Sequence, residues 1–113
     1  SLSALSSIKN NISHINFAST NISDKAMAFV AGSPNLVYLN LRNTSITDRG
    51  IALIAKAQHL EYLNLVSTQV TDKSINTIAN IKTLKSIYTF NSGITESGLE
   101  VLQTALPNAK IVY

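Results

Sequence analysis

Apolar and polar residues alternate in short stretches of this chain, and each such stretch is followed by apolar residues at helical spacing. In "LEYLNL", residues 60–65, Leu63 and Leu65 fall on one side of an extended backbone and the residues between them fall on the other. In "TDKSINTIA", residues 71–79, apolar residues recur at i, i+3 and i+4 from Ile75, which places them on one helical face. The pattern predicts a short strand followed by a short helix.

The same strand-then-helix pattern recurs every 24 residues. Four kinds of position keep this step in one register: apolar Ile15, Leu39, Leu63 and Ile87; apolar Ile22, Ile46, Val70 and Ile94; hydroxyl-bearing Thr20, Thr44, Thr68 and Ser92; and acidic Asp24, Asp48, Asp72 and Glu96. A unit of this size cannot bury its apolar face alone, so neighbouring units must stack around one shared core. We therefore expect an α/β solenoid of about four 24-residue units.

The start of each helix carries a hydroxyl residue followed by an acid. We expect Ser23, Thr47, Thr71 and Thr95 to be N-caps, because a side-chain oxygen there can accept a backbone N–H of the first turn. The acid after each cap is favourable at the positive end of a helix. Repeated carboxylates bind calcium in some solenoids, but helix-start chemistry already accounts for this column, so we expect no metal site.

Composition narrows the functional classes. A chain of 113 residues is the length of one domain, and the absence of cysteine excludes disulfides, thiolate zinc sites and cysteine nucleophiles. The net charge is +3, but three of the cations directly follow an acid and the others form no run, so we expect no nucleic-acid binding. No apolar run is long enough to span a bilayer, and we expect no membrane contact. His14 and His59 lie at different places in the repeat, and no nucleophile, base and acid converge, so we expect neither catalysis nor a cofactor.

Two stretches carry a family resemblance. "LVYLNLRNTSITDRG", residues 36–50, and "LEYLNLVSTQVTDKS", residues 60–74, resemble a leucine-rich repeat of the T-x-[IV]-T-D-x-G type. The resemblance implies a right-handed arc with a parallel sheet on the concave face and helices on the convex face. It also implies that the Thr20, Thr44, Thr68 and Ser92 hydroxyls point inward and bond the backbone of the turns.

The order of the repeats is similar to the C-terminal leucine-rich segment of bacterial membrane-anchored proteins that also carry c-type cytochrome domains. The residues that match that family's last repeat and tail are Tyr88, Phe90, Leu106 and Pro107, and those that depart from it are Thr89 and Ser92. The resemblance implies a periplasmic or cell-envelope location. Because the chain has no Cys-x-x-Cys-His, any haem would lie outside it.

We expect a single domain over residues 1–113 that is a fragment of a longer protein. Its expected parts are an N-terminal cap helix and turn at 1–12, with Leu2, Leu5 and Ile8 at three-residue spacing, repeats at 13–36, 37–60, 61–84 and 85–108, and a closing strand at 109–113. The proline-asparagine pair of the last segment is shifted by one place relative to "SPNLVYL" at 33–39, which leaves the register of the closing strand open.

Strand alternation also predicts which side chains face the hollow of the arc. The candidate partner-binding residues there are Tyr38, Asn40, Arg42, Tyr62, Asn64, Tyr88 and Phe90. Tyrosine and arginine are enriched at interaction hot spots, although tyrosine and asparagine also suit solvent-facing strands without binding anything. We expect a non-catalytic protein–protein interaction module. The alternatives are a carbohydrate-binding module that uses the Tyr and Asn columns and the substrate-recognition arm of an F-box-type ubiquitin ligase.

Overall fold

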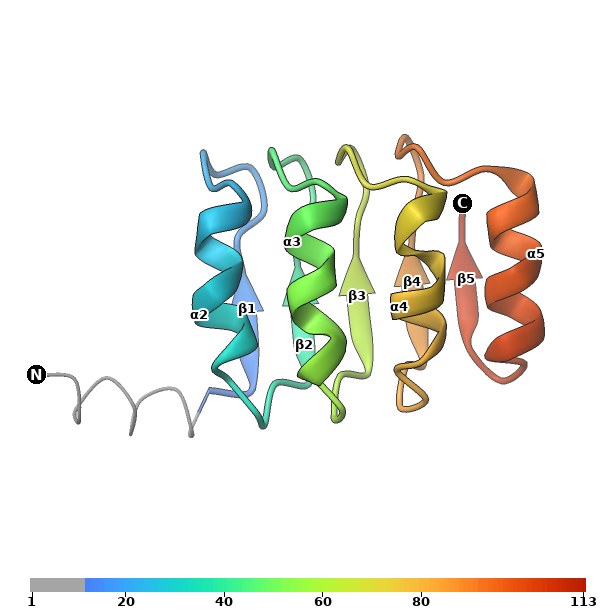
Figure 1. Ribbon diagram of the computed structural model, residues 1–113, viewed down its shortest axis with the longest axis horizontal. Coiled ribbons are helices and arrows are strands. Elements are labelled where there is room, and N and C mark those ends of the chain that lie inside the picture. The colour runs from blue at the N-terminus through green and yellow to red at the C-terminus, as the bar shows by residue number, and fades with distance from the viewer. Residues whose placement is uncertain (1–11) are drawn as a thin grey trace, which may run out of the picture.

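The computed structural model describes residues 12–113, and the expected cap helix carried by Leu2, Leu5 and Ile8 lies outside them. The described chain forms a five-stranded parallel sheet whose strands follow one another in sequence order. The strands are β1 (His14–Asn16), β2 (Tyr38–Asn40), β3 (Tyr62–Asn64), β4 (Ser86–Tyr88) and β5 (Lys110–Val112). Figure 1 shows all five arrows pointing the same way, with the helices in a second layer on one face of the sheet.

One short helical segment follows each of the first four strands. The segments are η1 (Asp24–Ala26) with α2 (Met27–Ala31), α3 (Asp48–Ala52) with η2 (Leu53–Lys56), η3 (Asp72–Ser74) with α4 (Ile75–Ala79), and α5 (Glu96–Ala105). Neighbouring strands pair residues that are 24 positions apart, as in Leu39 with Leu63 and Leu63 with Ile87. The predicted α/β solenoid of stacked strand-turn-helix units is confirmed.

The core lies between the sheet and the helices. Its inward strand residues Leu39, Leu63 and Ile87 are fully buried, and so are Ile54 and Ile78 from the helical layer. Fully burying one aliphatic side chain stabilises a fold by about 1.5–3 kcal/mol, and here each repeat shares its buried positions with the next. The stack therefore has one continuous core and no separate core in any single repeat.

The turn after each strand is held by the predicted hydroxyls. Each hydroxyl donates to the carbonyl three residues earlier at 2.6–2.8 Å, in the pairs Thr20–Phe17, Thr44–Leu41, Thr68–Leu65 and Ser92–Thr89. The residue before each hydroxyl has a positive φ of 55–57°, namely Ser19, Asn43, Ser67 and Asn91. The left-handed residue turns the chain back toward the helical layer, and the hydroxyl bond holds that reversal in place.

The last repeat differs from those before it. Helix α5 has ten residues, against five in α2 and in α4. In the interior of the stack, the Val37 carbonyl accepts two backbone N–H groups of the following repeat at 2.8 and 3.1 Å. The equivalent carbonyl, Ala109 O, instead accepts the Gln103 side-chain amide at 3.3 Å, and the same amide also donates to Leu106 O at 3.2 Å. The Gln103 amide therefore supplies a hydrogen bond that the backbone of the following strand supplies in the interior repeats.

Strand β5 keeps the common register, because Ile111 pairs with Ile87. The division of the chain at 13–36, 37–60, 61–84, 85–108 and 109–113 stays a prediction. Among residues 12–113, no helix combines the length and the apolar character needed to cross a bilayer.

Candidate interaction surface

The sheet face turned away from the helices presents the outward strand side chains, and we call it the open face. Each strand contributes two residues to it, and the inter-repeat backbone bonds continue past β1 to β4, so the residue two places after each of these strands joins them: His14, Asn16 and Ala18; Tyr38, Asn40 and Arg42; Tyr62, Asn64 and Val66; Ser86, Tyr88 and Phe90; Lys110 and Val112. All seven predicted partner-binding residues therefore lie on one face. Whether they bind a partner stays a prediction.

Four aromatic side chains form a stacked row across the open face, which we call the aromatic ladder: His14, Tyr38, Tyr62 and Tyr88. The ring centroids of Tyr38 and Tyr62 are 4.3 Å apart with planes 9° from parallel. His14 stacks on the other side of Tyr38 at 5.5 Å, and Tyr88 lies on the other side of Tyr62 at 5.3 Å with a 44° tilt. In-register parallel strands are about 4.8 Å apart, which is close to the separation that stacked rings favour.

The last step of the ladder is diagonal. Ser86 pairs with Tyr62 in the sheet, so the tyrosine column stops at β4. Tyr88 stands two residues further along β4, opposite Asn64, yet its ring contacts Tyr62. A side chain as long as tyrosine can reach a diagonal neighbour across two strands. The ladder consequently continues past the point where the sequence column ends.

Parallel rings stack on Tyr38 from both sides, and one face of Tyr62 is covered by Tyr38, with the tilted Tyr88 ring beside it. A ligand on the open face therefore meets mainly the ring edges and the phenol hydroxyls of these two tyrosines. The stacking therefore limits how a ligand can contact these tyrosines, which their number alone would not indicate.

The two predicted asparagines support the surface from within it. Asn40 accepts the Arg42 backbone N–H at 3.0 Å and donates to the Tyr38 hydroxyl at 3.4 Å. Asn64 makes the same two bonds in the next repeat, and it is only 8% exposed. Each amide thus uses both of its polar ends to fix the end of a strand and the hydroxyl of the tyrosine beside it.

Tyr62 is held in its neutral form. Burial raises the pKa of its phenol, the nearby Tyr38 raises it further, and the hydrogen bond from Asn64 opposes both effects without cancelling them. The Tyr62 hydroxyl therefore remains a potential hydrogen-bond donor across the ordinary pH range.

The residues that follow the strands form a row beside the ladder: Ala18, Arg42, Val66 and Phe90. Backbone bonds of 2.8–3.0 Å between successive repeats hold this row in order, since each of Arg42, Val66 and Phe90 accepts an N–H from the repeat before it. Arg42 is exposed, and Phe90 is 65% exposed. A large apolar side chain and a guanidinium are thus presented to solvent along one edge of the ladder.

No acidic side chain lies on the open face. The chain has six acids, and all of them are elsewhere: Asp24, Asp48 and Asp72 at helix starts, Glu61 before β3, and Glu96 and Glu100 on α5. The ionisable cationic groups on the face are Arg42, Lys110 and His14. The open face therefore carries only cationic or neutral groups.

The three aspartates have a structural role that the sequence did not reveal. Asp24 accepts the backbone N–H of Thr47 at 2.8 Å and its hydroxyl at 2.5 Å, one repeat later. Asp48 binds Thr71 in the same way, and Asp72 binds Thr95. The sequence predicts that these acids interact with the starts of their own helices, but the carboxylates bond the next repeat. We call these pairs the Asp–Thr clamps.

The caps and the clamps share the same threonines. The Thr47 and Thr71 hydroxyls accept backbone N–H groups of their own helices at 3.3 and 3.2 Å, and Thr95 does so at 3.4 Å, so these three predicted N-caps are confirmed. Ser23 stands at the predicted N-cap position of η1, but its side chain makes no capping bond. Because each clamped hydroxyl donates to the aspartate, its lone pairs point toward the first turn of its own helix.

The clamps also explain the small residue three places after each clamped threonine, namely Gly50, Ser74 and Gly98. A Cβ at Gly50 would collide with the Asp24 carboxylate, and one at Gly98 would collide with that of Asp72. At the equivalent place in the third repeat, Ser74 donates its hydroxyl to Asp48 at 2.6 Å. The glycine of the T-D-x-G pattern therefore leaves room for the carboxylate of the preceding repeat.

Asp48 is the most fully bonded of the clamping acids. Partial burial is the largest single influence and raises the pKa of its carboxyl, but the bonds from Ser74 and Thr71 and the charge of Lys73 together lower it below the ordinary value. The ionised carboxylate is therefore favoured in the folded chain.

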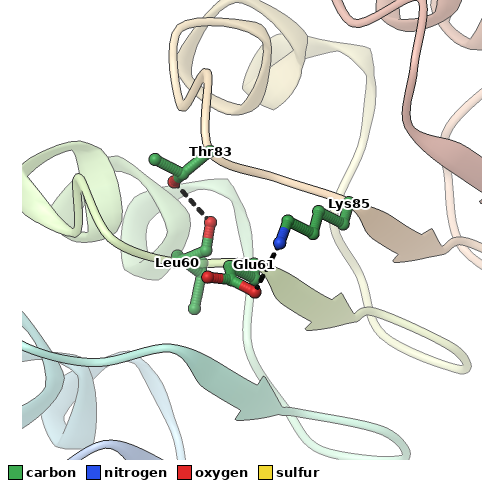
Figure 2. Close-up of polar contacts among 4 residues, drawn as sticks. All are labelled: Leu60, Glu61, Thr83 and Lys85. Carbon is green, nitrogen blue, oxygen red and sulfur yellow. Dashed lines mark hydrogen bonds and ion pairs between the residues drawn. The ribbon is translucent and has the colours of Figure 1, made fainter.

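A second set of contacts joins repeats at the other end of the strands. Lys85 pairs with Glu61 at 3.2 Å, and the Thr83 hydroxyl donates to the Leu60 carbonyl at 2.6 Å. Figure 2 shows these two contacts side by side. The Lys85 side chain is 74% exposed, so the ion pair contributes about 1 kcal/mol or less. These contacts align the loops that precede β3 and β4. In residues 12–113, no three His, Asp or Glu side chains gather in a way that could hold a metal ion.

The comparison with known sequences decides the type of repeat. The family model described as "Leucine Rich repeat" matches residues 32–55 and 56–79. Residues 32–79 therefore match two leucine-rich repeats, and the stacked strand-turn-helix fold agrees with that match. Among solved structures, a leucine-rich repeat protein of Leptospira interrogans superposes with a TM-score of 0.70 at 18% sequence identity. The match covers 91% of this chain and 26% of that one, so the chain spans about a quarter of the length of the solved protein. No curated protein matches the chain by sequence.

Leucine-rich repeats typically form non-catalytic modules that mediate protein–protein interactions, which agrees with the general function expected from the sequence. The likeness to the segment of cytochrome-domain proteins, with the cell-envelope location that it implies, stays a prediction.

Proposed function

We propose that this leucine-rich repeat chain is the protein-binding module of a larger cell-envelope protein and that it binds its partner through the open face. The observation that carries the proposal is the 65% exposure of Phe90 beside a row of stacked aromatic rings. Packing the core does not require a large apolar side chain at this position, because its equivalents in the other repeats are Ala18, Arg42 and Val66. Exposed aromatic and arginine side chains are typical anchors of protein interfaces.

The ladder favours binding because it is rigid before a partner arrives. Tyr38 and Tyr62 are fixed by stacking and by the amides of Asn40 and Asn64. Side chains that are already ordered lose little conformational entropy on binding, and this increases affinity. The surface is therefore suited to a partner that docks on preformed contacts.

A carbohydrate ligand is less well supported. Sugar rings bind tyrosines mainly by lying on the aromatic face, and stacking already covers both faces of Tyr38 and one face of Tyr62. The amides of Asn40 and Asn64, which would bond sugar hydroxyls, are used within the surface.

The proposal is tested by capturing envelope proteins of the source organism on the immobilised chain and on Phe90→Ala and Arg42→Ala variants. Lys56→Ala is the matched control, because Lys56 is exposed and belongs to the helical layer. We expect the same partner on the wild type and the control, and at least about a fivefold loss on the two open-face variants, the equivalent of 1 kcal/mol each. Equal capture on all four proteins would exclude the open face as the binding site.

The cell-envelope assignment has a separate test. A gene that encodes membrane helices and a Cys-x-x-Cys-His motif in the same reading frame would support it, and so would recovery of the tagged full-length protein in the envelope fraction. An F-box in that reading frame would instead support the ubiquitin-ligase alternative.

A further inference from the structure

We infer that the segment bound by the open face is an extended, acidic peptide of the partner protein, with a carboxylate at Arg42 and an apolar side chain on Phe90. This inference rests on the proposed function and adds the chemistry of the partner. It is drawn from the charges, the hydrogen-bonding groups and the spacing of the open face.

The first argument is charge. None of the six acids of the chain lies on the open face, whereas Arg42 and Lys110 are exposed there. The clamping acids are bonded to threonines of the next repeat, and Glu61 is paired with Lys85. The positive charge of the open face is thus not compensated locally, and complementary charge is what selects a partner and its orientation.

The second argument is the balance of donors and acceptors. Asn40 and Asn64 donate to the Tyr38 and Tyr62 hydroxyl oxygens, so these oxygens already accept one bond each. If one of these two hydroxyls donates its proton to the other, the hydroxyl that accepts it can still donate its own proton to a ligand. Together with the five N–H donors of Arg42, the face offers donors and few free acceptors. Carboxylates and peptide carbonyls supply the matching acceptors.

The third argument is spacing. Arg42 follows β2 and Phe90 follows β4, so the two side chains stand two strand intervals apart, about 10 Å, with Val66 between them. An extended peptide rises about 3.3 Å per residue. A segment that crosses the strands therefore reaches both anchors when its acidic and apolar residues are about three positions apart.

A nucleic acid would also bring negative charge, but the surface fits it poorly. Of the two exposed cations, Arg42 follows β2 and Lys110 begins β5, three strands away, so they do not track a phosphate backbone. Single-stranded bases bind by stacking on free aromatic faces, and stacking within the ladder already covers both faces of Tyr38 and one face of Tyr62.

The experiment is selection from a displayed library of random peptides, about twelve residues long, on the purified chain, which is the folded unit described above. Enriched peptides are synthesised, and their dissociation constants are measured by fluorescence anisotropy against the wild type, Arg42→Glu, Phe90→Ala and the charge-reversal control Lys56→Glu. Circular dichroism shows whether each variant is folded. A dT20 oligonucleotide is measured alongside as the nucleic-acid probe.

We expect the enriched peptides to carry Asp or Glu about three residues from an apolar residue. Arg42→Glu should weaken them about tenfold, since it replaces an attraction with a repulsion, while Lys56→Glu should change affinity by less than about twofold. A peptide with Lys in place of its acid should bind Arg42→Glu better than it binds the wild type.

The outcomes separate the two proposals. Peptides that need Phe90 but carry no acid, or that bind Arg42→Glu as well as the wild type, would overturn the acidic inference and leave the open face as the binding site. Peptides indifferent to both Phe90 and Arg42 would overturn both proposals. A library that yields no binder would overturn the peptide inference alone, and the capture experiment would still decide whether the open face binds a protein. Tighter binding of dT20 than of any acidic peptide would replace the peptide ligand with a nucleic acid.

Discussion

The Asp48 carboxylate accepts both the backbone N–H and the hydroxyl of Thr71, at 2.8 and 2.5 Å, across an interval of 23 residues. The same hydroxyl caps its own helix by accepting the Lys73 N–H at 3.2 Å. One carboxylate therefore fixes the start of the next helix and the stacking of two repeats together.

Replacing Asp48 with Ala should lower the free energy of unfolding by about 1–3 kcal/mol, because it removes charge-assisted bonds to Thr71 and Ser74 and leaves the Thr71 cap unoriented. Urea unfolding followed by circular dichroism measures the change. Glu100→Ala is the control, since Glu100 is exposed on α5, and it should shift stability by less than about 0.5 kcal/mol. Equal effects of the two substitutions would contradict the clamp.

The stability of the chain should also fall in acid because of Asp48. Its pKa in the folded chain is below the ordinary value of 3.8, so its contribution is fully present above that pH and is lost as the pH falls through the lower folded value. Urea midpoints measured from pH 7 down to about 2 should therefore decline more in the wild type than in Asp48→Asn, which has no carboxylate to protonate. Parallel declines would show that Asp48 does not contribute to the acid sensitivity.

Gly50→Ala should destabilise the chain, although alanine is usually favoured over glycine within a helix by about 1 kcal/mol. The added Cβ would collide with the Asp24 carboxylate, and such overpacking costs about 1–3 kcal/mol, so the expected net change is a loss. Gly50→Ser is the informative comparison. Its hydroxyl can bond the carboxylate as Ser74 bonds Asp48, so it should be less damaging than alanine despite its greater size. A thermal melt of the two variants decides the order.

Gln103→Ala should loosen the last strand. It removes the side-chain amide that bonds the Ala109 carbonyl, at a cost of about 1 kcal/mol. Hydrogen exchange should quicken at Lys110–Val112, where the single neighbouring strand is β4, and should stay unchanged in β2 and β3. Uniformly faster exchange would mean that Gln103 supports the whole stack.

The fold could be predicted because it follows from the spacing of residues along the sequence. A 24-residue step in several columns fixes the strand register, and alternation places Leu63 inward and Tyr62 outward. The turn hydroxyls were also predictable, since Thr68 bonds a carbonyl only three residues away. Each of these inferences depends on local spacing.

The features that the sequence did not reveal depend on which of two possible neighbours a side chain contacts. From the sequence, the Asp48 carboxylate could equally bond the first turn of its own helix or the next repeat. The three-dimensional structure shows that it bonds Thr71 of the next repeat. Likewise, the repeat pattern does not predict that the Tyr88 ring turns toward Tyr62, because Tyr88 is the repeat equivalent of Asn64. The asparagines were recognised as outward, but their bonding to the tyrosines required coordinates.

Since every clamp joins an aspartate to a threonine 23 residues later, and every strand pairs with a neighbour 24 residues away, the two ends of any interior repeat present equivalent contacts. A gene duplication of 24 codons within the interior would thus lengthen the arc without requiring a new type of contact. A shift of one codon would separate the clamps from the strand register. The length of such a protein can therefore evolve in whole repeats, and the binding surface lengthens by one strand at each step.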